Sequence, residues 1–126
     1  MPSLGPFKPD TIVQGDALAI MGMLPENCVD LVITSPPYYN AVPEYASWDS
    51  YEDYLRWTLR VWKACYRIIK IGGRICANVC AGYNRDPFLP IGADTTIQLR
   101  EVGFLLRGQI VWDKGQQSSG RTAWGS

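Results

Sequence analysis

A small polar side chain and an aromatic ring stand close together in the run Ser35-Pro36-Pro37-Tyr38. The run directly follows an apolar stretch, 29–33, whose length and composition are typical of a buried strand. Proline fixes φ at about −65° and restricts the residue before it, so this turn is stiff. Because neither proline has an N–H, the carbonyls around the turn are open to hydrogen bonds from a ligand. The pattern predicts rigid acceptors beside a ring on which a flat ligand can stack.

The elements around this turn alternate between strands and helices, which indicates a mostly parallel sheet flanked by helices. The expected strands are 11–14, 29–34, 74–80 and 104–113, and the expected helices are 17–24, 51–71 and 91–102. The continuous apolar runs suit strands that are buried on both faces. Open α/β sheets bind ligands at the carboxyl ends of their strands, so the proline turn stands where a site is expected.

The long helix should begin after Ser50, an N-cap residue, and end at Gly72 and Gly73. Apolar residues at helical spacing predict its core face: Leu55, Leu59, Trp62, Tyr66 and Ile69. Basic residues recur at the same spacing on another face: Arg56, Arg60, Lys63, Arg67 and Lys70. Such a stripe is usually the solvated side of a helix, although it could also touch phosphates.

Composition narrows the function classes. With 126 residues the chain is at most one domain. Twelve basic and twelve acidic residues give no net charge, so a DNA-binding surface would be local or lie outside this chain. Four cysteines without a C-x-x-C pair, and no histidine, predict no metal site and a reduced, cytoplasmic protein. No signal peptide and no membrane-length apolar run is present, so no membrane partner is expected.

The proline turn resembles the catalytic motif of the DNA amino-methyltransferases, which methylate N4 of cytosine or N6 of adenine. In that family Asp, Asn or Ser precedes Pro-Pro and an aromatic residue. The resemblance runs from about residue 11, through the Gly15-Asp16 corner and the motif, to the segment ending at Lys114. It implies an α/β fold with a partial Rossmann-like methyltransferase sheet of mostly parallel strands.

The resemblance also implies roles for the motif. The Ser35 side chain and the Pro36 carbonyl would accept hydrogen bonds from the exocyclic amine, and Pro37 would complete the turn. Tyr38 would stack on a base flipped out of double-stranded DNA. Serine at the first motif position favours N4 of cytosine over N6 of adenine.

The cofactor implied by the resemblance is S-adenosyl-L-methionine, with Asp16, Ala17 and Thr34 as its contacts. Asp16 would also make a good helix N-cap, and both roles can hold together. Tyr39 and Asn40 are further candidates for the target-base pocket.

No glycine loop of the Phe-x-Gly-x-Gly kind follows any expected strand. In the permuted class that begins with the Pro-Pro-Tyr half, this loop and the target-recognition region come later. We therefore expect residues 1–114 to be the N-terminal, catalytic-motif half of a methyltransferase domain and residues 115–126 to be a loop or flexible tail. The expected partners are double-stranded DNA and a complementing C-terminal half or a second copy of the chain.

Other functions remain open. Pro-Pro-Tyr alone also suits an ordinary turn or a polyproline ligand. Without a glycine loop, the chain could be a non-catalytic fragment that binds nucleic acid or a partner subunit through its sheet edge. Related enzymes also methylate a protein glutamine or an RNA base, but they usually carry asparagine at the first motif position and place the glycine loop before the motif.

Overall fold

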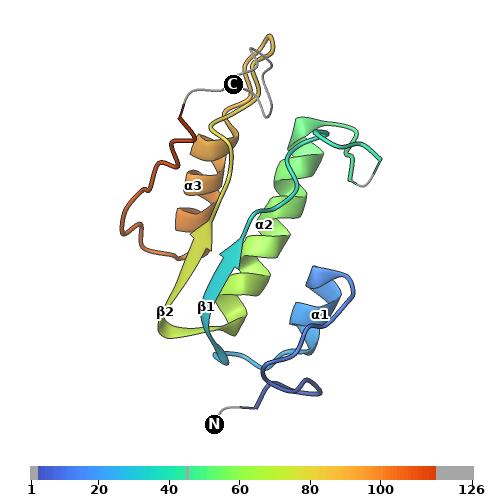
Figure 1. Ribbon diagram of the computed structural model, residues 1–126, viewed down its shortest axis with the longest axis vertical. Coiled ribbons are helices and arrows are strands. Elements are labelled where there is room, and N and C mark those ends of the chain that lie inside the picture. Colours follow the sequence, from blue (N-terminus) through green and yellow to red (C-terminus); the bar gives the residue numbers. More distant parts are fainter. Residues whose placement is uncertain (1–2, 45, 116–126) are drawn as a thin grey trace.

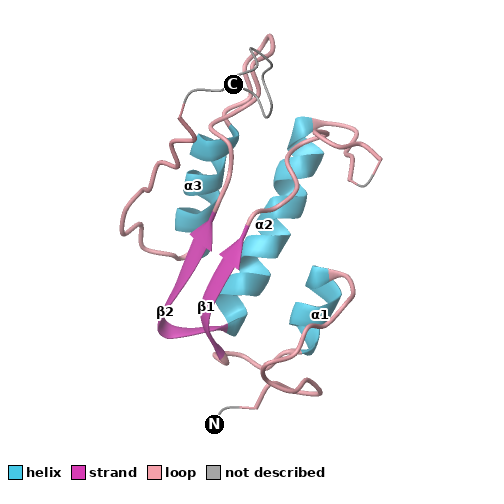
Figure 2. Ribbon diagram, in the orientation of Figure 1, coloured by secondary structure: helices cyan, strands magenta, loops and turns pink. Residues whose placement is uncertain are grey.

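The computed structural model describes residues 3–44 and 46–115, which form a small α/β unit (Figure 1). Its elements are α1 (Ala17–Met23), β1 (Val29–Thr34), α2 (Tyr51–Ile68), β2 (Ile69–Ala77) and α3 (Ile91–Val102). Within these residues β1 and β2 form a parallel sheet, and α2 is the crossover between them. Figure 2 shows both strands pointing the same way beside the long helix. The α/β expectation is confirmed.

The hydrophobic core lies between α2 and one face of the sheet. Its buried members are Cys28, Trp62, Cys65, Ile68 and Ile69. Partly buried residues from α1, α3 and both strands pack against this cluster, so the three helices share one core on one side of the sheet. Trp62 is fully buried and is the largest side chain there.

The opposite face of the sheet is uncovered in the part of the chain that the structure describes. Side chains alternate between the faces of a strand, so Val32 packs against the core while its neighbours Leu31 and Ile33 point away. Leu31 is 48% exposed and Ile33 is 73% exposed. The expectation that these strands are buried on both faces is therefore wrong for the described residues.

The buried face of α2 is rotated from the expected one. Its buried residues are Tyr54, Thr58, Trp62, Cys65 and Ile68. Leu55 and Leu59 are only half-buried, and Tyr66 is 48% exposed. The hydroxyls of Tyr54 and Thr58 form hydrogen bonds inside the protein, so these polar residues can occupy the buried face. A pattern drawn from apolar residues alone misplaces that face.

The end of α2 also differs from expectation. The helix ends at Ile68, and β2 begins at once with Ile69, so Gly72 and Gly73 lie inside the strand. Gly72 has φ +86°, which favours glycine. A Cβ added at Gly73 would come within 2.8 Å of the Asp30 carbonyl. Gly72 thus provides a positive-φ backbone conformation and Gly73 a close approach to β1, beside a shift in pairing register, and neither is a helix stop.

Two expected strands are absent from the described residues. The segments 11–14 and 104–113 carry no regular secondary structure, and Ile12 and Ile110 are fully or almost fully exposed. A strand needs a neighbour to pair its backbone N–H and C=O groups. Among the described residues, the strands β1 and β2 pair only with each other. The apolar composition of the two segments gives them a propensity for strand structure, but no neighbouring strand is present among the described residues to pair with them. Most of the expected tail, 116–126, lies outside the described residues, so the boundary at 114 stays a prediction.

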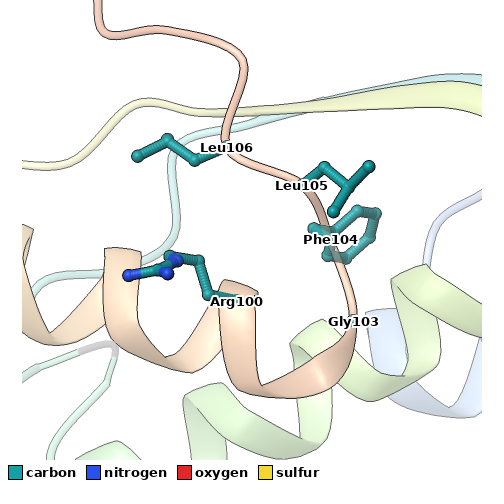
Figure 3. A pocket seen from close by; sticks show the side chains of 5 residues that line it. All are labelled: Arg100, Gly103, Phe104, Leu105 and Leu106. Carbon is teal, nitrogen blue, oxygen red and sulfur yellow. The ribbon is translucent and has the colours of Figure 1, made fainter.

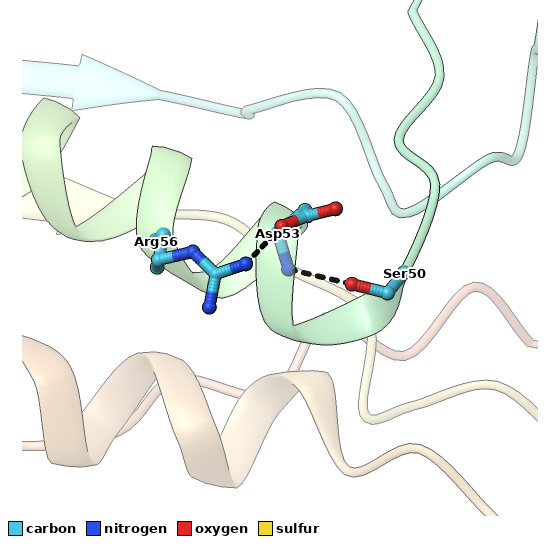
Figure 4. A network of polar contacts seen from close by, with 3 residues as sticks. All are labelled: Ser50, Asp53 and Arg56. Carbon is cyan, nitrogen blue, oxygen red and sulfur yellow. Dashed lines mark hydrogen bonds and ion pairs between the residues drawn. The ribbon is translucent and has the colours of Figure 1, made fainter.

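Ser50 fixes the start of α2. Its side-chain oxygen accepts a hydrogen bond from the Asp53 N–H at 3.1 Å, and the Asp53 carboxylate pairs with Arg56 (Figure 4). Acidic side chains in the first turn also interact favourably with the helix dipole. The cap therefore determines where the first turn of α2 lies.

Ser50→Ala should lower the free energy of unfolding by about 1 kcal/mol, because an N–H of the first turn loses its acceptor. Ser50→Asp keeps an oxygen acceptor and should cost much less. Urea unfolding followed by circular dichroism measures both. Equal losses in the two variants would show that the side-chain oxygen is not the cause.

Candidate functional site

The proline turn lines an open pocket at the carboxyl end of β1. Thr34 is the last residue of that strand, and the chain then turns through the motif. The pocket has a volume of about 230 Å³ and is lined by Ser35, Pro36, Pro37, Tyr38, Ala41, Val42 and Ala46. Ser35 is exposed, Pro36 is buried and Tyr38 is half-buried. The four motif residues are thus together, with a hydroxyl-bearing residue at the surface and its neighbour anchored inside.

Tyr54 of α2 holds the turn from the protein interior. Its hydroxyl donates a hydrogen bond to the Pro37 carbonyl at 2.8 Å, and its side chain is only 1% exposed. Burial, followed by the proximity of Cys80 and Tyr83, raises the pKa of Tyr54 well above its ordinary value, so the hydroxyl stays a donor. Sequence analysis missed this residue. The spacing of Tyr54, Thr58 and Trp62, which places them on one helix face, was the signal that could have predicted its burial.

Aromatic rings gather around Tyr54. The ring of Trp48 meets it edge-on at 4.8 Å between centroids, and Tyr51 stacks on it at 6.1 Å. Tyr39 packs at 5.8 Å from the same ring and meets Tyr83 edge-on at 6.3 Å. Tyr39 is therefore part of this aromatic cluster and is not among the residues that line the pocket.

Asn40 closes the loop that follows the motif. Its Nδ2 donates to the Trp48 carbonyl at 2.9 Å, and its Oδ1 accepts from the Trp48 N–H at 2.7 Å. Asn40 also has φ +49°, a left-handed conformation that asparagine tolerates. Like Tyr39, it lies beside the pocket rather than in its lining. Its side chain holds the loop that forms one pocket wall.

The residues expected to contact the cofactor are not joined to each other in the described part of the chain. Asp16 is the N-cap of α1, as expected, and its Oδ2 accepts from the Ala19 N–H at 2.9 Å. Ala17 is the exposed first residue of the helix, whereas Thr34 is half-buried at the end of β1. No hydrogen bond among the described residues connects the start of α1 with Thr34.

A second hollow lies at the end of α3, away from the motif. It has a volume of about 420 Å³ and is lined by Arg100, Gly103, Phe104, Leu105 and Leu106. Figure 3 shows the side chains of Phe104, Leu105 and Leu106 on the segment that leaves the helix, with Arg100 below them. The lining supplies no nucleophile or acid–base group. This hollow suits packing rather than chemistry.

Metal centres and membrane spans are both absent from the residues that the structure describes. No group of three or more histidine, cysteine, aspartate or glutamate side chains is placed there to hold a metal ion. No helix in the same residues has both the length and the apolar character needed to span a membrane.

Solved structures define the class of the fold, which is that of the Rossmann-like methyltransferases. TTHA0409 of Thermus thermophilus, described as a candidate DNA modification methylase, matches 78% of this chain and 47% of its own with a TM-score of 0.58 and 27% identity. The same protein in complex with S-adenosyl-L-methionine matches 78% of this chain and 48% of its own, with a TM-score of 0.60 and 28% identity.

Sequence comparison defines the family. A family profile described as DNA methylase, for the N6 and N4 enzymes, matches residues 29–124. The type II methyltransferase M.MjaVI of Methanocaldococcus jannaschii is 37% identical over 119 residues, which are 92% of this chain and 59% of that protein. M.BslI of a Bacillus strain is 30% identical over 120 residues, 87% of this chain and 13% of its own length. The chain belongs to the N6/N4 DNA methylase family, and it spans less than two thirds of the length of these relatives.

Proposed function

We propose that this chain is the catalytic-motif half of an S-adenosyl-L-methionine-dependent DNA methyltransferase that acts on an exocyclic base amine. One observation carries the proposal. Ser35, Pro36, Pro37 and Tyr38 line a single open pocket at the carboxyl end of β1, in a chain of the N6/N4 DNA methylase family. The DNA substrate in turn favours a cytoplasmic location.

Methylation of an exocyclic amine requires hydrogen-bond acceptors that are held in fixed positions. An exocyclic amine is a poor nucleophile because its lone pair is delocalised into the ring. The Ser35 hydroxyl and the Pro36 carbonyl accept hydrogen bonds from the amine and so draw its nitrogen towards tetrahedral geometry. Ser35 acts as an acceptor rather than as an activated base, since the chain contains no histidine. Tyr38 stacks on the flipped base.

The pocket volume is compatible with this role. At about 230 Å³ it is smaller than sites for drug-sized ligands, which begin at about 300 Å³. A single ring system, such as one base held out of the duplex, is a ligand of the right scale. With serine at the first motif position, we propose N4 of cytosine as the target in preference to N6 of adenine. Tyr39 and Asn40 support this pocket from the side.

S-adenosyl-L-methionine, when bound, supplies the methyl group. We propose Asp16, Ala17 and Thr34 as the residues of this chain that contact it. The exposed Asp16 uses one carboxylate oxygen to cap α1, and its other oxygen has no protein partner among the described residues. A carboxylate in this position suits the polar groups of such a ligand. The complex of TTHA0409 with S-adenosyl-L-methionine supports the choice of this molecule as the cofactor.

One face of the sheet is uncovered among the described residues. We propose that a C-terminal half, or a second copy of the chain, covers the exposed face with Leu31 and Ile33 and pairs with a strand edge. The apolar composition of 29–33 is that of a strand covered on both sides, yet one side is open here. Because the chain has no net charge, the same segment would also supply much of the DNA-binding surface.

A transfer assay tests the proposed function. The chain is mixed with the C-terminal part of M.MjaVI, duplex DNA and labelled S-adenosyl-L-methionine, and the nucleosides are separated after digestion. We expect label in N4-methylcytosine, with the chain alone as the control. Label only in N6-methyladenine would correct the target base. No transfer from a mixture that is folded and associated would contradict the proposal.

The second candidate function is a non-catalytic fragment that binds nucleic acid or a partner through its sheet edge. The open edges of β1 and β2 among the described residues favour it. Calorimetry with S-adenosyl-L-methionine separates the two functions. Micromolar binding by this chain alone would argue against a fragment without a catalytic role.

A further inference from the structure

We propose that Tyr54 is a positioning residue, which acts through its hydrogen bond to Pro37 to hold the motif acceptors towards the target amine. The inference rests on the proposed function, because it assigns a supporting residue to the same pocket. Tyr54 lies on α2, outside the motif and outside the pocket lining.

The turn cannot hold its own shape through internal N–H donors, because Pro36 and Pro37 have none. In the described part of the chain, backbone hydrogen bonds fix the turn at its two ends. The Thr34 carbonyl accepts from the Asn78 N–H at 2.8 Å, and the Tyr38 carbonyl accepts from the Ala41 N–H at 3.2 Å. Between these two points a donor must come from elsewhere.

Tyr54 supplies that donor. Its bond to the Pro37 carbonyl, at 2.8 Å, is the one side-chain hydrogen bond to the turn in the part of the chain that the structure describes. With the Pro37 carbonyl engaged towards the interior, the Ser35 hydroxyl and the Pro36 carbonyl are left for a ligand. The acceptors of the proposed chemistry and the anchored carbonyl are therefore different groups.

Tyr54 is itself held in place. Its side chain is buried, and the rings of Trp48, Tyr51 and Tyr39 surround it. Trp48 is also the residue that Asn40 clamps through two hydrogen bonds. The pocket wall formed by Ala41, Val42 and Ala46 lies within that clamped loop. The buried Tyr54 ring thus contacts the proline turn directly and, through Trp48, the loop that supplies the other lining residues of the pocket.

Tyr54→Phe removes the hydroxyl and keeps the ring. In the complemented enzyme we expect kcat to fall by about 10- to 100-fold, since a small misplacement of reacting groups has effects of that size. The KM for DNA should change by no more than about twofold, because Tyr54 does not line the pocket. A purely structural role would lower the amount of folded enzyme without this split between kcat and KM.

Tyr51→Phe is the matched control. The Tyr51 hydroxyl donates to the Asp94 carboxylate at 2.6 Å, in the same aromatic cluster but away from the turn. The Tyr51→Phe variant loses one hydroxyl hydrogen bond, as Tyr54→Phe does. Because that bond does not reach the turn, kcat should remain near the wild-type value. Replacing Tyr54 by p-aminophenylalanine returns an N–H donor to the same place and should restore most of the lost kcat.

Amide hydrogen exchange gives a readout that does not depend on activity. In the chain alone, the Ala41 amide should exchange about tenfold faster or more in Tyr54→Phe, while amides in the second half of α2 keep their protection. Tyr51→Phe should leave the Ala41 amide unchanged. An unchanged Ala41 rate in folded Tyr54→Phe would overturn the inference, whether or not transfer is detected.

Three variants distinguish failure of the proposed function from failure of the positioning role. If Ser35→Ala retains full transfer, the proposed function fails. If Ser35→Ala abolishes transfer while Tyr54→Phe and Tyr51→Phe have the same kcat, only the positioning role of Tyr54 fails.

Discussion

Ser35→Ala is expected to lower methyl transfer by about 100- to 1,000-fold, the effect of removing one preorganised hydrogen-bonding group from an active site. The Ser35 side chain is exposed and has no hydrogen-bond partner among the described residues, so its loss should leave stability within about 0.5 kcal/mol of wild type. Ser47→Ala, another exposed serine of the neighbouring loop, is the control and should transfer normally. Initial rates with labelled cofactor measure the effect.

Tyr38→Ala extends the same test to base stacking. Loss of a stacked ring costs about 1–3 kcal/mol per base, so transfer should fall by about 10- to 100-fold. Tyr38→Phe keeps the ring and should retain most of the activity. Substantial transfer by the double variant, with Ser35→Ala and Tyr38→Ala together, would refute both roles.

Trp62→Ala should lower the free energy of unfolding by about 3–5 kcal/mol, because a fully buried indole leaves a cavity at the centre of the core. Native proteins are stable by about 5–15 kcal/mol, so this loss would remove a large share of the stability. Trp62→Phe should cost less, since the Trp62 Nε1 is buried without a hydrogen-bond partner among the described residues.

Urea unfolding measures this change, and Trp57→Ala on the same helix is the control. Trp57 is only half-buried, so its loss should cost clearly less than that of Trp62. Similar midpoints for the two variants would contradict the placement of Trp62 at the centre of the core.

Local signals in the sequence predicted part of the fold. The strand 29–34 and the helix 91–102 have the expected bounds, and α2 begins where the Ser50 cap placed it. These features depend on apolar runs, caps and turn residues within a few positions. Such patterns can be recognised in the sequence because a cap or a proline determines the structure of the backbone next to it.

The features that could not be predicted depend on contacts between residues that are far apart in the sequence. The segments 11–14 and 104–113 have strand-like composition, but pairing depends on neighbours that the described residues do not supply. The face of α2 was misplaced because Tyr54 and Thr58 are buried through bonds to Pro37 and Gln98.

The candidate site also combines features that local sequence predicts with features that depend on distant residues. The motif Ser35-Pro36-Pro37-Tyr38 was visible as a contiguous run, and its position after a strand followed from the apolar pattern. Tyr54, which anchors the turn, lies on a separate helix and carries no motif of its own. Asn40 was predicted near the target base, but its pairing with Trp48 depends on the path of the loop, which spacing does not reveal.

The most direct test is the methylated base itself. Genomic DNA from a methylation-deficient bacterial host that expresses the complemented chain is digested, and its nucleosides are quantified by mass spectrometry. We predict N4-methylcytosine with the wild type and with Ser47→Ala, and almost none with Ser35→Ala at equal protein levels. Equal amounts of methylated base with Ser35→Ala would contradict the claim that this proline-stiffened turn presents the acceptors for the reacting amine.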